Sequence, residues 1–78
     1  MKKYNEEKMV NTLFNRIEKN KEICVWDFPN YDEHLLSEIS EIIDLLIECL
    51  EIEGYHTKRY ELPKCGWGLA NKTLVEIL

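Results

Sequence analysis

The sequence predicts one small α+β domain, with two helices packed on a small mixed sheet that ends in a C-terminal hairpin. Two long segments carry apolar residues every three or four positions, which is the helical period. Shorter segments rich in β-branched and aromatic residues end at prolines, as strands do. The 78 residues leave room for one core, so we expect a single domain over residues 1–78, in the order α-β-α-β-β.

The first helix is expected over Asn5–Lys19. Asn5 is a suitable N-cap, and Asn20 can adopt the left-handed conformation that ends a helix. The apolar stripe of this segment consists of Val10, Leu13, Phe14 and Ile17.

A strand is expected over Glu22–Phe28, up to Pro29. Its β-branched and aromatic residues fall on both faces, which is typical of an internal strand. Trp26 is therefore expected in the core.

The second helix is expected over Tyr31–Glu53, with Asn30 and Glu33 forming a capping box and Gly54 following the last turn. Its buried stripe would consist of Leu35, Leu36, Ile39, Ile42, Ile43, Leu46, Cys49 and Leu50. The apolar arc is widened by Leu45, Ile47 and Ile52. A helix so broadly apolar is either sandwiched between elements or shared with another subunit.

Residues Tyr55–Leu62 alternate as a strand does, and Pro63 ends them. Lys64 begins a tight loop that contains Trp67 between two glycines. The segment Lys72–Leu78 is read as a third strand, with a short helix as the alternative. If the strands on either side of the second helix pair in parallel, their crossover should be right-handed.

The charge of the chain is strongly segregated. Residues 22–56 hold ten of the fifteen carboxylates and no lysine or arginine, whereas the flanks hold ten basic residues and five acids. The formal net charge of −5 therefore combines a block of −10 with flanks of +5. Such a block favours a basic partner surface and argues against binding nucleic acid through the same face.

Five carboxylates in the second helix are spaced three, three, four and three residues apart. We call this set the acidic ladder; it consists of Glu38, Glu41, Asp44, Glu48 and Glu51. On a helix they form one exposed ridge, with a rise of roughly 5 Å between members. The ridge is interpreted as a mimic of a phosphate backbone that occupies a basic groove of a partner. The alternative is a solvated face neutralised by Arg16, Lys58 and Arg59.

Trp67 and Tyr31 are the candidate aromatic anchors at the rim of that surface, because aromatic residues are enriched among interface hot spots. The alternative for Trp67 is a lid folded back on the core.

The sequence predicts neither an enzyme nor a cofactor or metal site. The five Cys and His residues (Cys24, Cys49, Cys65, His34 and His56) lack the paired spacing of zinc sites. Cys65 with His56 is the one conceivable nucleophile and base, and Cys24 with Cys65 the one conceivable disulfide. No apolar span or signal segment is found, which predicts a cytoplasmic protein.

In size, acidity and lack of a catalytic signature, the chain resembles small phage-encoded inhibitors of host or defence proteins, anti-CRISPR and DNA-mimic proteins among them. It also resembles small bacterial immunity proteins that neutralise a toxin with an acidic face. Both resemblances are compositional and imply a stoichiometric inhibitor of a basic, nucleic-acid-handling partner. Two alternatives stay open: a homo-oligomeric regulator or adaptor that pairs through Leu45, Ile47 and Ile52, and a nucleic-acid-binding module that uses the basic and aromatic residues of Lys58–Lys64.

Overall fold

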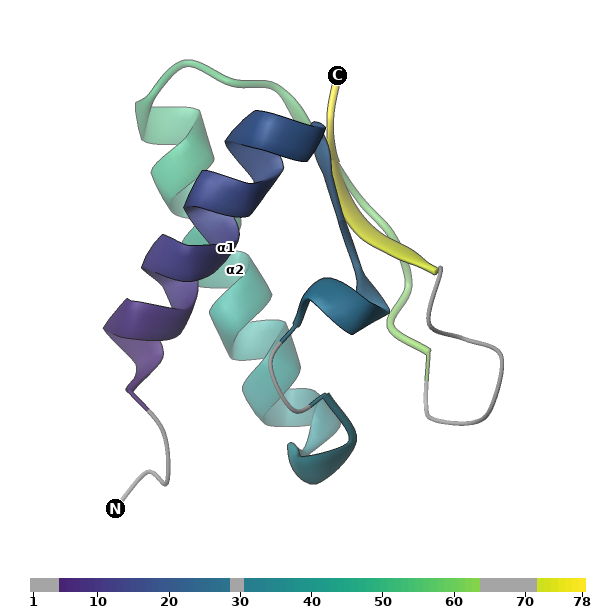
Figure 1. Cartoon of the computed structure of the whole chain (residues 1–78). Helices are drawn as coiled ribbons and strands as arrows, with labels where there is room; N and C mark the ends of the chain where they lie inside the picture. The colour runs from purple at the N-terminus through teal and green to yellow at the C-terminus, as the bar shows by residue number, and fades with distance from the viewer. Residues whose placement is uncertain (1–4, 29–30, 64–71) are drawn as a thin grey trace.

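The helices and strands form an α+β domain whose C-terminal part is a hairpin, which confirms the predicted fold class (Figure 1). The computed structural model describes residues 5–28, 31–63 and 72–78. The elements are α1 (Glu6–Asn20), β1 (Glu22–Cys24), the 3-10 turns η1 (Val25–Asp27) and η2 (Tyr31–Glu33), α2 (Leu36–Ile52), β2 (Thr57–Arg59) and β3 (Thr73–Ile77).

The strand order in the sheet is β1-β3-β2, and both pairings are antiparallel. The C-terminal segment is thus a strand, and it occupies the centre, where Leu74 and Val75 are fully buried. The strand at Glu22 lies at an edge and not inside the sheet. Because β3 separates β1 from β2, the two strands that flank α2 do not pair with each other, and the sheet is antiparallel and not mixed.

Helix α1 begins where its sequence predicts. The Asn5 side chain accepts a hydrogen bond from the Lys8 backbone N–H at 3.0 Å, as an N-cap does. The helix ends one residue later than expected, since Lys21 and not Asn20 is left-handed, with φ of 68°.

Helix α2 begins five residues later than predicted. The chain first makes the η2 turn, and Leu35 is extended, with φ of −71° and ψ of 148°. The Glu38 carboxylate accepts a hydrogen bond from the Leu35 N–H at 2.9 Å and so caps the first turn. At the other end, Gly54 has φ of +93°, which fits its expected place after the helix.

The predicted strand at Glu22–Phe28 is cut short by η1. Asp27 accepts a hydrogen bond from the Cys24 backbone N–H at 3.0 Å, which turns the chain after three strand residues. Val25 and Phe28 therefore point into the core, whereas Trp26 is 70% exposed. The prediction that Trp26 is buried was wrong.

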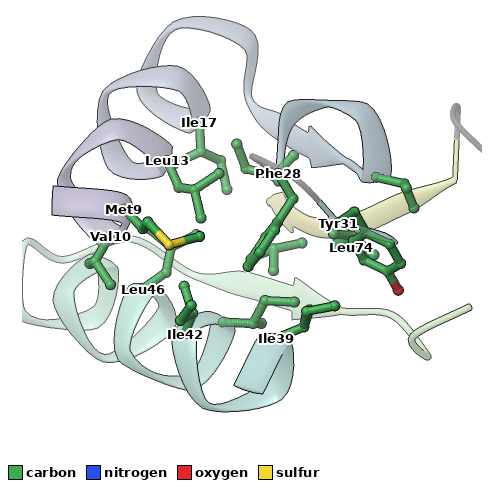
Figure 2. Packing of buried hydrophobic residues seen from close by; sticks show 14 of the residues in the cluster. Met9, Val10, Leu13, Ile17, Phe28, Tyr31, Ile39, Ile42, Leu46 and Leu74 are labelled. Atoms are coloured by element: carbon green, nitrogen blue, oxygen red, sulfur yellow. The ribbon is translucent and has the colours of Figure 1, made fainter. Parts of the chain in front are cut away.

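The core lies between the two helices and the sheet, and Figure 2 shows how side chains of α1 and α2 meet Phe28 and Tyr31 in it. Its fully buried side chains are Leu13, Ile17, Ile23, Ile39, Ile42, Ile43, Leu46, Leu50, Leu74 and Val75. Helix α1 packs against β1, and α2 packs against α1 and β2. The two helices thus contact each other, and each also contacts one of the two edge strands of the sheet.

Candidate functional site

The acidic ladder lies on the solvent side of α2. Glu41, Asp44, Glu48 and Glu51 are exposed, and Glu38 is half-buried because it caps the helix. The buried residues of the same helix, such as Ile42 and Leu46, project from the opposite side. The structure thus brings the five predicted carboxylates together along one helix.

One of the three cations expected to neutralise the ladder contacts it. Arg59 of β2 donates hydrogen bonds to Asp44 and, at 2.6 Å, to the Ser40 hydroxyl. Arg16 instead pairs with Asp27 at 3.1 Å. The Lys58 ammonium lies 4.9 Å from the ring centroid of Tyr60. Of the five ladder carboxylates, Asp44 is thus the one whose charge Arg59 neutralises directly.

Tyr31, one of the two predicted aromatic anchors, does not reach this surface. Tyr31 is 7% exposed and belongs to the core. Its hydroxyl donates to the Pro63 carbonyl at 2.7 Å, and its ring meets Phe28 edge-on. An anchor at a rim needs an exposed ring, so Tyr31 cannot serve as one. Trp67 and the Cys65 pairings lie outside the described residues.

Sequence reasoning missed an exposed tryptophan beside a polar groove. Trp26 borders an open groove of about 590 Å³, which we call the Trp26 groove. Its lining consists of Thr12, Asn15, Arg16, Lys19 and Asn20 from α1 and Trp26 and Asp27 from η1. The first four recur at helical spacing and mark a polar stripe. That stripe could have been read from the sequence; the exposure of Trp26 could not.

A second polar cluster is formed by the strands. Glu22 accepts hydrogen bonds from the Cys24 thiol and the Thr73 hydroxyl, each at 3.2 Å. Burial, and then the neighbouring Glu22 carboxylate, raises the pKa of the Cys24 thiol. A raised pKa keeps the thiol protonated at neutral pH, the opposite of what a nucleophile or metal ligand needs. Within residues 5–28, 31–63 and 72–78, no three His, Cys, Asp or Glu side chains are grouped to hold a metal ion.

Most side chains of the broad apolar arc of α2 pack against the core of the same domain. Leu45 and Ile47 are half-buried against the core, whereas Ile52 is 76% exposed. Ile52 also borders a small hollow of about 230 Å³ with Phe14 and Cys49. Of the helices described, none is long and apolar enough to cross a bilayer.

Comparison of the chain with protein-family models, with curated proteins and with solved structures finds no match.

Proposed function

We propose that this chain is a small acidic interaction protein that inhibits a basic, nucleic-acid-binding partner stoichiometrically. The acidic ladder would dock on the partner's basic patch and block access to it. The observation that carries the proposal is the exposure of four ladder carboxylates on the solvent side of α2. Their spacing along a rigid helix offers a partner a fixed row of negative charge.

The composition of the ladder supports an electrostatic role over simple solvation. Solvated helices usually mix acidic and basic side chains, because alternating signs stabilise a helix by i,i+4 pairing. Helix α2 contains no lysine or arginine. Like charges at these spacings cost a few tenths of a kcal/mol per pair, a cost that binding to a basic surface would relieve. Association steered by such a field should be fast and weakened by salt.

The test compares capture of proteins from a lysate of the cells that make the chain. The ladder variant carries Glu41→Gln, Glu48→Gln and Glu51→Gln, which leaves the Asp44–Arg59 pair in place. A matched control removes the same charge from three exposed acids outside the ladder, through Glu33→Gln, Glu53→Gln and Glu61→Gln.

We expect the wild type and the control to capture a basic protein that added DNA and high salt displace. The ladder variant should capture much less of it. Equal capture by all three chains would overturn the proposal.

A further inference from the structure

The Trp26 groove and the end of the acidic ladder carry complementary groups with the same spacing. In the groove, Arg16 and Lys19 are three residues apart on α1. On α2, Glu48 and Glu51 are also three residues apart and exposed. Both pairs therefore have a rise of about 4.5 Å along their helices.

Each charged pair also has an exposed apolar side chain beside it. Trp26, 70% exposed, lines the groove together with Arg16 and Lys19. Ile52, 76% exposed, follows Glu51 directly on α2. Tryptophan and arginine are among the residue types enriched at binding hot spots. The two constellations thus match in charge, spacing and apolar content.

The two surfaces cannot meet within one molecule. Helix α1 packs on α2 and the core through its buried side, which carries Val10, Leu13 and Ile17, whereas the groove residues Arg16 and Lys19 are on its exposed side. The ladder is on the solvent side of α2, so both surfaces face away from the contact between the two helices. The groove of one copy can therefore receive only the ladder of another.

We propose that the Trp26 groove binds the C-terminal end of the acidic ladder of a second copy, so that the chains assemble head to tail. Arg16 and Lys19 would pair with Glu48 and Glu51, and Trp26 would pack on Ile52. Arg16 is 45% exposed and keeps free donors beside its contact with Asp27, since a guanidinium has five N–H groups. Because the two surfaces differ, the contact is heterologous and extends into a ring or an open chain.

This inference depends on the proposed function to the extent that both use the ladder as a binding surface. The copy's own groove would then compete with a basic partner for Glu48 and Glu51. Self-assembly would keep Glu48 and Glu51 covered until a partner with more positive charge displaces the second copy.

The test is a charge exchange followed by sedimentation velocity at low ionic strength. One variant reverses the groove, Arg16→Glu with Lys19→Glu, and the other reverses the ladder, Glu48→Lys with Glu51→Lys. We expect the wild type to gain mass as its concentration rises, and each variant alone to stay monomeric because its two surfaces repel.

An equimolar mixture of the two variants should associate again, since every junction between them joins opposite charges. Restored association requires both variants to be folded, so misfolding cannot imitate it. A monomeric wild type at every concentration, or a monomeric mixture, would overturn the proposal.

Single substitutions test the apolar contact. Trp26→Ala and Ile52→Ala should each weaken wild-type association several-fold, whereas Leu78→Ala, at an equally exposed residue, should not. Loss with Ile52→Ala but not with Trp26→Ala would assign association to the apolar arc of α2 and overturn the head-to-tail contact.

The capture experiment separates this inference from the proposed function. The groove variant retains its ladder and should still capture the basic partner. A monomeric wild type that captures a partner through the ladder refutes the inference alone. A wild type that assembles head to tail, with capture unaffected by the ladder substitutions, refutes the proposed function alone.

Discussion

The guanidinium of Arg16 lies 3.1 Å from the carboxylate of Asp27, which joins the C-terminal half of α1 to the turn that carries Trp26. The other oxygen of the same carboxylate accepts a hydrogen bond from the Cys24 backbone N–H. Asp27 is 13% exposed, whereas Arg16 is 45% exposed. The Asp27 carboxylate therefore stabilises the turn that follows β1, through its bond to Cys24, and holds this turn against α1, through its pair with Arg16.

Replacement of Asp27 should destabilise the domain more than replacement of its partner. Asp27→Ala leaves the Cys24 N–H without its acceptor, which costs about 1–3 kcal/mol. Arg16→Ala loses a half-exposed ion pair, which costs about 0.2–1 kcal/mol. Urea denaturation of both variants and of Asp27→Asn, which keeps an acceptor, measures the difference. Equal losses for Asp27→Ala and Arg16→Ala would show that the bond to Cys24 contributes little.

Replacement of Arg59 should increase the net negative charge of the acidic ladder and should destabilise the fold only slightly. The Arg59–Asp44 pair is at the surface, with side chains 35% and 60% exposed, so Arg59→Gln should cost at most about 1 kcal/mol. The same change frees the Asp44 carboxylate and makes the ladder more negative. A basic partner should then bind more tightly at low salt, as measured by titration calorimetry. Weaker binding by Arg59→Gln would contradict a role of the ladder charge.

Local signals predicted one helix start and one helix end, but not the start of α2, which the expected capping box of Asn30 and Glu33 placed five residues too early. The cap at Asn5 and the glycine after α2 follow from side-chain and backbone preferences within one helical turn, and both are found. The acidic ladder likewise needed only the helical period, because spacing alone places its members along one helix.

Features set by distant contacts could not be predicted in this way. Trp26 is turned outward because Asp27 bonds to Cys24 and to Arg16 of another helix. Tyr31 is buried partly because its hydroxyl reaches the Pro63 carbonyl, 32 residues away. The edge position of β1 depends on pairing with β3 at the far end of the chain. Hydrophobic periodicity contains none of these relationships.

Truncation of a core side chain should remove a large part of the free energy of unfolding of this small domain. Leu46 is fully buried at the centre of α2, so Leu46→Ala should cost about 2–5 kcal/mol. The exposed Leu78 provides the control, because Leu78→Ala should change stability by no more than about 0.5 kcal/mol. Thermal denaturation followed by circular dichroism compares the two. A Tm for Leu46→Ala close to that of Leu78→Ala would mean that the core relaxes around the deletion.

High pH should destabilise the domain through two tyrosines that donate to carboxylates. The Tyr55 hydroxyl bonds to Glu18 at 3.1 Å, and the Tyr60 hydroxyl bonds to Glu76 at 2.9 Å. In both tyrosines the pKa is raised above its usual value of about 10, and the hydrogen bond to the carboxylate is the largest cause of the shift. The folded chain then holds these protons at a pH where the unfolded chain has released them.

The resulting stabilisation is complete below the ordinary tyrosine pKa and is lost as the pH rises through the raised pKa of the folded state. We expect the free energy of unfolding from urea titrations to fall more steeply above about pH 10 for the wild type than for Tyr55→Phe with Tyr60→Phe. Because lysines in general titrate in the same range, the informative quantity is the difference in slope between the wild type and the double variant. Glu18→Gln should return the pKa of Tyr55 toward its usual value in a spectrophotometric titration. Identical slopes in the wild type and the double variant would show that these bonds do not couple protonation to folding.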